Sequence, residues 1–308
     1  LHGLNVELHG GVARELGIRH EDARNADAGL RNQYVPEVNL GATAQLGAHP
    51  ISLGLNLAAT GGGGYDYGRI ATPFGNQDRL SSLFGIVRAS VGAATYVASG
   101  VAVGASFGLS YARLDQDFFS DTSVPNPADP SQPFFGTRIE DGQAIGTGFR
   151  LGALWQVSDR LSLGAAYGSK VELPVESGRL DINMAAEGLG KVHYDDLKLN
   201  GLAQAQELGV GASYRLTPRW LVAADLAWLN WSDALTTTTL RASDPDDPAA
   251  PAVLRTTSVL DWRDQYVVAV GTAYQPVEPV TLWGGYNYGR NPIPNDHLSP
   301  LLPNIGEH

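Results

Sequence analysis

The residues that most often carry enzyme chemistry are spread along this 308-residue chain without a recognisable spacing. The seven histidines form no HExxH pair or other metal-ligand pattern, and no GxSxG nucleophile elbow surrounds a serine. Cysteine is absent, which excludes disulfides, thiol nucleophiles and thiolate-bound metals. The acidic clusters at 115–117 and 244–247 lack EF-hand spacing, so solvated loop charge is the simpler interpretation. We therefore expect neither an enzyme nor a cofactor nor a metal site.

Apolar side chains instead gather in two segments that are otherwise polar. The first, 115–141, carries two pairs of phenylalanines among Asp, Pro and Ser, and the second, 178–192, carries aliphatic residues that would form one side of a short helix. Apolar residues on an exposed loop bury against something, either a hydrophobic ligand in a groove or the neighbouring loops. The candidate groove residues are Phe118, Phe119, Phe134, Phe135, Leu180, Met184 and Leu189.

Basic side chains offer a second kind of recognition, because a guanidinium binds a carboxylate through paired hydrogen bonds. Arg113 and Arg263 stand where predicted strands meet long connections, and they are the preferred candidates for holding a ligand carboxylate. By parity, Arg88, Arg150, Lys170 and Arg215 lie on the polar faces of strands. The alternative for each cation is an ion pair with a nearby Asp or Glu in a wet interior.

The elements that must position these residues are β-strands. In 145–157 one face reads Ile, Thr, Phe, Leu, Ala, Trp, Val and the other reads Gly, Gly, Arg, Gly, Leu, Gln. The same period of two recurs along the chain and is typical of strands with one apolar face. We expect eleven strands at about 3–16, 35–46, 50–60, 82–98, 100–114, 142–157, 160–173, 206–216, 219–231, 263–276 and 279–289.

The connections between these strands alternate between short turns and long segments. Long loops are expected at about 17–34, 61–81, 115–141, 174–205, 232–262 and 290–308. This asymmetry is typical of an all-β transmembrane barrel, an antiparallel up-and-down meander with long extracellular loops in a Gram-negative outer membrane. The alternative, a β-sandwich, is disfavoured because the strands are long, aromatic residues sit at the ends of the apolar faces, and the opposite faces are small and polar.

Composition limits the partners. The net charge of −11 argues against nucleic acid. The sequence contains no run of ~18 apolar residues, so it predicts no membrane-spanning helix. A membrane barrel remains possible, because apolar and polar residues alternate along barrel strands and give no continuous apolar run. We expect a single barrel domain over 1–308. Its partners are expected to be outer-membrane lipid and lipopolysaccharide, and the protein is expected to be a monomer.

Three segments resemble the FadL family of outer-membrane channels for long-chain fatty acids and aromatic hydrocarbons. They are LSLGAAYGSKVEL (161–173), ELGVGASYRLTPRWLVAADLAWLNWSDA (207–234) and YVVAVGTAYQPVEPVTLWGGYNYGRNPIPNDHLSPLLPN (266–304). The resemblance implies a fourteen-stranded barrel plugged by an N-terminal hatch. Since no segment here reads as the hatch and eleven strands are expected, we expect the hatch and the last strands to be missing from this sequence.

The resemblance also assigns a role to the four consecutive glycines Gly61, Gly62, Gly63 and Gly64. Glycine weakens strand pairing and permits a kink, and in the family a kink in the third strand opens the barrel wall sideways. The alternative is a flexible loop root. The expected function is passive uptake of a hydrophobic small molecule, captured in an extracellular groove and released laterally. A non-selective polar porin or a structural or adhesive barrel is the competing interpretation.

Overall fold

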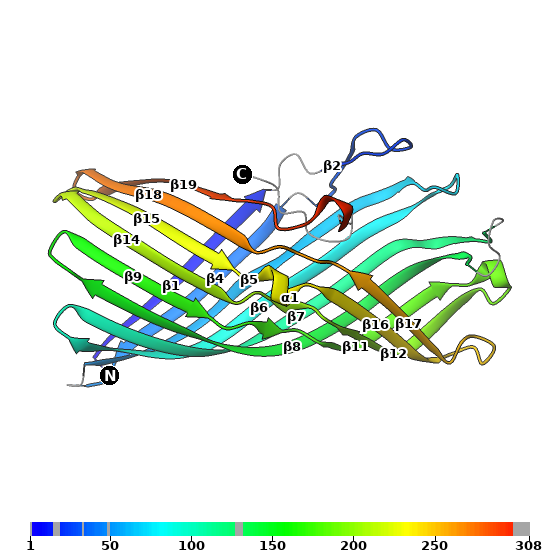
Figure 1. Ribbon diagram of the computed structural model, residues 1–308, viewed down its shortest axis with the longest axis horizontal. Helices are drawn as coiled ribbons and strands as arrows, with labels where there is room; N and C mark the ends of the chain where they lie inside the picture. The colour runs from blue at the N-terminus through cyan, green and yellow to red at the C-terminus, as the bar shows by residue number, and fades with distance from the viewer. Residues whose placement is uncertain (1, 15–18, 33, 48–49, 127–131, 298–308) are drawn as a thin grey trace.

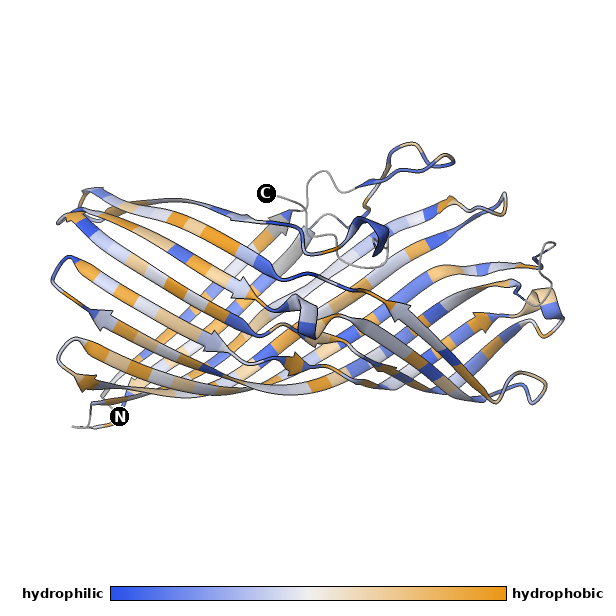
Figure 2. Ribbon diagram, in the orientation of Figure 1, coloured by the Kyte–Doolittle hydropathy of each residue, from blue (hydrophilic) through white to orange (hydrophobic). Residues whose placement is uncertain are grey.

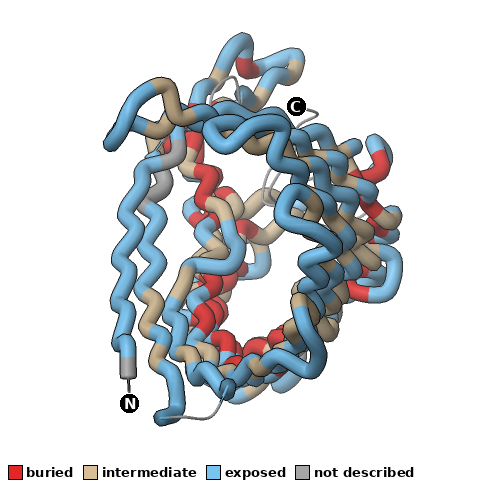
Figure 3. The backbone as a smooth tube through the Cα atoms, turned by 90° about the vertical axis from the view of Figure 1, so that its left-hand side faces the viewer, coloured by how far each residue is buried: buried red, intermediate tan, exposed pale blue. Residues whose placement is uncertain are grey.

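Eleven long strands form one antiparallel meander in the computed structural model, which describes residues 2–14, 19–32, 34–47, 50–126 and 132–297 (Figure 1). Their number and chain order confirm the prediction. They are β1 (His2–Arg14), β4 (Tyr34–Gln45), β5 (Ile51–Ala71), β6 (Gln77–Ala98), β7 (Val101–Val124), β8 (Phe134–Gln156), β9 (Leu161–Gly168), β14 (Glu207–Thr217), β15 (Trp220–Leu229), β18 (Gln265–Val277) and β19 (Val280–Gly289). Viewed from the end in Figure 3, the sheet curls around a central lumen. Within the described chain, β1 and β19 are its two edges.

Alternation along the strands separates an outer apolar face from an inner face of small and polar residues. Leu109 and Tyr111 on β7, and Ile145 and Trp155 on β8, are exposed on the outside. A strand segment of ~10 residues that is tilted by ~40° from the barrel axis rises about 25 Å along that axis. This equals the height of the apolar band of an outer-membrane barrel. Figure 2 shows orange segments alternating along the strands in the half that ends in short turns. That half is the membrane-spanning part.

The other half of the molecule is built mainly from strands where long loops were expected. The segment 61–81 extends β5 and β6, and 115–141 extends β7 and β8. Two further hairpins pair β11 (Val175–Asn183) with β12 (Lys191–Asn200) and β16 (Thr237–Pro245) with β17 (Val253–Val259). The short helix expected in 178–192 is wrong, apart from one 3-10 turn, η1 (Ala185–Glu187). Leu180, Ile182 and Met184 recur every two residues, which is the period of a strand.

Short elements complete the described chain. They are β2 (Arg19–His20), β3 (Ala28–Gly29), β10 (Val171–Glu172), β13 (Ala203–Gln204), α1 (Trp231–Ala234) and η2 (Asn295–His297). No helix in the described ranges has the length and hydropathy needed to cross a membrane. Most of the expected loop 290–308 lies outside the described residues, as do parts of 17–34 and 115–141.

The buried core lies in the outer half of the molecule. One cluster combines Ile86 and Leu114 of the wall with Leu173, Leu180 and Tyr194 of the inner segments and added hairpins. A second cluster at the outer end of β5–β7 contains Tyr65, Leu80 and Phe119. The outer hairpins are therefore packed structures that can hold a cavity of fixed form.

Candidate functional site: an apolar cavity and a gap in the sheet

A cavity of about 760 Å³ lies among the outer hairpins. Its walls come from β6, β7 and β8 on one side and from the two added hairpins on the other. Most of its lining is apolar, with hydroxyl and charged groups at a few points. This volume and lining fit a hydrophobic molecule of small to moderate size. The apolar lining residues include Phe84, Leu114, Phe134, Phe135, Ile139, Leu180, Ile182, Met184, Leu199, Leu202, Leu240 and Leu254.

Four of the seven predicted groove residues line this cavity: Phe134, Phe135, Leu180 and Met184. Leu189 packs instead against the adjoining core. Phe118 and Phe119 stack on each other with ring centroids 4.9 Å apart and belong to the second cluster, beside Leu80. Phe134 joins the two regions, with its ring centroid 6.0 Å from that of Phe118. The phenylalanines therefore divide between cavity lining and hairpin packing, the two interpretations that the sequence left open.

The two preferred arginines are not among the residues that line the cavity. Arg113 shares the outward face of β7 with Leu109 and Tyr111, by parity. Its guanidinium lies 2.7 Å from a carboxylate oxygen of Asp115 and 2.7 Å from one of Asp141. Arg263 is exposed beyond the start of β18, where its backbone N–H donates to the carbonyl of Pro292. This geometry does not favour either residue as the partner of a ligand carboxylate in the cavity.

Sequence reasoning missed the contribution of the hairpin β16–β17. Leu240, Leu254 and Arg255 from this hairpin line the cavity, together with His297 of η2. The segments TTTLRASDP and VLRTTSV are strand-like, but their threonines and charges concealed the apolar stripe. The β-branched residues of the two segments, Thr237–Thr239 in the first and Val253, Thr256, Thr257 and Val259 in the second, were the available signal.

A short internal pair of strands lies between the outer cavity and the inner lumen. β10 pairs with β13, and the Leu173 N–H donates to the Leu202 carbonyl at 2.8 Å. Val171 and Leu173 rest on the wall where Gly146 leaves room for them, since a Cβ there would lie 2.8 Å from Val171. On the far side, the Gln204 amide donates to the carbonyl and the hydroxyl of Thr60, both at 3.3 Å. We call β10, β13 and the residues between Ser169 and Leu173 the partition.

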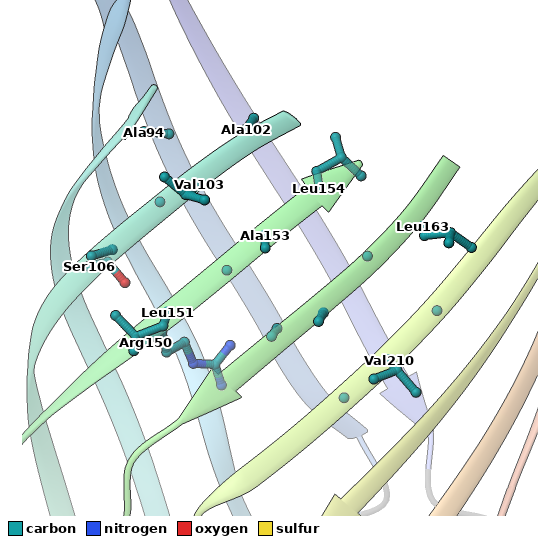
Figure 4. A pocket seen from close by; sticks show the side chains of 18 of the residues that line it. Ala94, Ala102, Val103, Ser106, Arg150, Leu151, Ala153, Leu154, Leu163 and Val210 are labelled. Atoms are coloured by element: carbon teal, nitrogen blue, oxygen red, sulfur yellow. The ribbon is translucent and has the colours of Figure 1, made fainter. Parts of the chain in front are cut away.

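Inside the membrane-spanning half, small residues keep the lumen open. A cavity of about 970 Å³ is lined by inward-facing residues such as Ala94, Ser106 and Arg150 (Figure 4). Arg150 lies 3.6 Å from Glu207, across β9 from it. The inner lumen is therefore wide and lined mainly by small residues, with Arg150 and Glu207 as charged groups among them.

The glycine run on β5 sits at a β-bulge within a continuous strand. Thr60 is the extra residue, because Ala59 faces Val87 and Gly61 faces Ile86. The φ angle of Gly62 is +123°, and a Cβ at this position would lie 2.2 Å from the Phe84 carbonyl oxygen. Only glycine fits such a conformation without strain. The bulge also shifts the side-chain alternation by one residue, so that Tyr65 turns inward and is buried.

At the same bulge, β5 separates from β4. The two strands pair from Ser52 to Ala58, whereas β4 continues beside β1 as far as Tyr34 and β5 continues beside β6 to Ala71. Farther out, the Asn32 amide closes over β5 by donating to the Gly64 carbonyl at 2.7 Å. Across the described residues, the β4–β5 pairing therefore has a local gap at the glycine run, between the paired residues Ser52–Ala58 and the Asn32 contact.

Charged groups tie the tips of the outer hairpins together. Asp121 of β7 accepts hydrogen bonds from Arg69 of β5 at 3.1 Å and from Lys191 of β12 at 2.8 Å. These bonds, from Lys191 first and then Arg69, lower the pKa of Asp121. Arg138 binds the buried carboxylate of Asp117 through two hydrogen bonds. The hairpins that enclose the cavity are thus linked at neutral pH.

Comparison with known proteins bears on the family and the fold. The sequence model for the family described as outer membrane protein transport protein (OMPP1/FadL/TodX) matches residues 6–305. A Neisseria meningitidis serogroup B protein, named as an outer membrane protein, is 26% identical over 175 residues, or 53% of this chain. The chain spans only 37% of the length of that relative over the match.

Solved structures share the fold at low sequence identity. The toluene transporter TodX of Pseudomonas putida is 20% identical with a TM-score of 0.74, covering 99% of this chain and 76% of that protein. The toluene transporter TbuX of Ralstonia pickettii is 21% identical with a TM-score of 0.72, covering 93% and 76%. A Pseudomonas aeruginosa FadL homologue is 14% identical with a TM-score of 0.66, covering 97% and 72%.

Proposed function

Because the chain belongs to the outer membrane transport family of OMPP1, FadL and TodX, we propose that it serves passive uptake of hydrophobic small molecules. The observation that carries this proposal is the apolar cavity of about 760 Å³ among the outer hairpins. It offers an apolar ligand a binding place outside the membrane-spanning half. Burial of apolar surface contributes ~25 cal/mol per Å², which is sufficient to hold such a molecule without an energy source.

The proposed route leads from this cavity past the partition to the gap at the glycine run. Leu202, which directly precedes β13 of the partition, lines the outer cavity, and Gln204 of β13 contacts Thr60 at the bulge. A ligand that displaces this contact reaches the gap between β4 and β5 and enters the lipid sideways. The ligand thereby avoids a passage along the inner lumen, which contains the charged pair Arg150 and Glu207.

A polar porin is a poorer fit to the same features. A porin needs a continuous aqueous path with a charged constriction. Here the outer cavity is mainly apolar, and the partition, with Val171 and Leu173 buried, lies inside the wall between Gly146 of β8 and Thr60 of β5. The fatty-acid and aromatic-hydrocarbon classes share the apolar requirement, and the cavity lining serves both.

Cavity filling tests this proposal. Leu254→Trp places a large side chain in the cavity, while Thr257→Trp places one three residues along the same strand at a residue that does not line it. With both variants in liposomes, we expect Leu254→Trp to lower uptake of toluene and of dodecanoate by about tenfold and Thr257→Trp to leave both unchanged. Folding of each variant is checked by its heat-modifiable mobility in gel electrophoresis. Equal uptake by the two folded variants would show that ligands do not pass through the outer cavity.

A further inference from the structure

A polar pair interrupts the apolar wall of the outer cavity. Gln116 of β7 and Ser82 of β6 face each other across the strand pair, and both line the cavity. The Gln116 amide donates from Nε2 to the Ser82 hydroxyl oxygen at 3.2 Å. The residues around the pair are apolar, since Ile139 lies opposite Gln116 on β8, and Phe84 and Leu114 line the cavity beside it.

The pair leaves one acceptor and one donor without a partner among the described residues. Gln116 is half-buried, and its hydrogen bond to Ser82 uses the amide nitrogen, so that Oε1 accepts from no described residue. Ser82 is 5% exposed, and its hydroxyl accepts from that amide, so that the hydroxyl hydrogen donates to no described residue. Polar atoms beside apolar surface are unfavourable without a hydrogen bond, so a ligand group that bonds to both would be favoured here.

The wall around this pair is neutral. Every cavity-lining residue of β6, β7 and β8 is uncharged, and Thr137 of β8 adds a third hydroxyl. The charged lining residues Arg255 of β17 and Glu187 of η1 belong to the hairpins on the other side of the cavity. A carboxylate at neutral pH has only acceptors, so it has no donor to offer Gln116 Oε1, and a hydrocarbon has neither group. The pair therefore fits a neutral group that both donates and accepts.

We propose that Gln116 and Ser82 bind the hydroxyl group of a neutral apolar alcohol or phenol in the outer cavity. The ligand hydroxyl donates to Gln116 Oε1 and accepts from the Ser82 hydroxyl, while the apolar body lies against Phe84, Leu114 and Ile139. A site that hydrogen-bonds a ligand hydroxyl discriminates against the analogue that lacks it, because the polar groups of the site then stay unpaired. This inference rests on the proposed function and specifies a ligand class for its outer cavity.

Three probes that share one skeleton test the inference. They are 4-butylphenol, butylbenzene and 4-butylanisole, whose methyl ether accepts a hydrogen bond but cannot donate one. Binding to the full chain in nanodiscs is measured by displacement of a fluorescent apolar probe, with empty nanodiscs as the reference for partition into lipid. We expect the wild type to bind 4-butylphenol about 5- to 12-fold more tightly than either of the others, the factor that corresponds to the net contribution of a hydrogen bond.

Two cavity variants and a control locate the site of that preference. Gln116→Met removes the acceptor at nearly constant length, and we expect it to lower the affinity for 4-butylphenol to that for butylbenzene while leaving butylbenzene unchanged. Ser82→Ala removes the donor and should reduce the preference in part. Gln143→Met is the matched control, because Gln143 is exposed on β8 and does not line the cavity. If neither cavity variant folds, the comparison of 4-butylphenol with 4-butylanisole in the wild type still decides.

Each contrary result has a definite meaning. Equal binding of 4-butylphenol and butylbenzene by the wild type would overturn the inference and leave the proposed function standing. Binding of 4-butylanisole as tight as that of 4-butylphenol would also overturn it, since donation to Gln116 would then be unnecessary. A preference for 4-butylphenol that survives in both cavity variants would overturn it because the hydroxyl would be bound elsewhere. Displacement by none of the three probes would instead contradict the proposed function itself.

Discussion

The bulge at the glycine run gives the sharpest prediction for transport. Gly62→Ala adds a Cβ at φ +123°, within 2.2 Å of the Phe84 carbonyl oxygen and 2.8 Å of the Gly85 Cα. Both contacts are with backbone, so the strand itself must shift. A residue held in a backbone conformation of this kind costs about 1–3 kcal/mol, which reduces the population of the native bulge roughly 5- to 150-fold relative to rearranged pairing.

The position opposite supplies the control. Gly85 faces Gly62 across the β5–β6 pair, and a Cβ on Gly85 meets nothing within 4 Å. Gly62→Ala and Gly85→Ala therefore add the same methyl group to paired residues with opposite expected outcomes. We expect faster amide exchange over 59–66 and slower delivery of ligand to the lipid for Gly62→Ala alone. Equal exchange and equal uptake in the two variants would refute the assignment of a functional gap to this bulge.

Three other predictions concern the elements around the route. Gln204→Ala removes both contacts with Thr60, and we expect ligand to pass the partition several-fold faster in stopped-flow uptake, with no change if the partition is held by other groups. Phe119→Ala should destabilise the outer hairpins by roughly 3 kcal/mol with little effect on ligand affinity, because Phe119 packs in the second cluster. Phe135→Ala should lower ligand affinity, because Phe135 lines the cavity. The reverse pattern in denaturation and binding assays would show that Phe119 contacts the ligand and Phe135 packs the hairpins. The lowered pKa of Asp121 means that its contribution to hairpin stability is present above the ordinary carboxyl pKa of ~3.9 and is lost as the pH falls through the lowered value. Hydrogen exchange at the hairpin tips should therefore rise below about pH 4 in the wild type, and an equal rise in Asp121→Asn would contradict this cause.

The membrane-spanning half of the fold could be predicted from the sequence because lipid imposes a strict rule on it. Every second residue of a wall strand faces lipid, so Leu109, Tyr111 and Ile145 reveal their strands by position alone. The outer hairpins obey no such rule, since each of their faces meets either protein or water. That is why β16 and β17 were predicted as loop although both are paired strands.

The candidate site was partly predictable for a related reason. The phenylalanine pairs stood out by composition, but whether Phe119 or Phe135 lines the cavity depends on a register shift between Phe118 and Ser123 that no sequence pattern reveals. The preference for Arg113 followed from its position at a strand end, and its two aspartate partners became visible only when β7 and β8 were paired. Arg88 was assigned to a polar strand face by parity, but its burial depends on neighbouring segments whose position the sequence does not reveal.

The extra residue at Thr60 has a consequence for how such proteins can change over time. An in-frame loss of that one codon would remove the first register shift of β5, return Gly61–Gly64 to the opposite faces and turn Tyr65 toward the exterior. No apolar residue would be gained or lost, and the hydropathy profile would hardly differ. Within a lineage, the proposed sideways exit could therefore appear or disappear through a single small deletion or insertion that substitution-based comparison of sequences would not register.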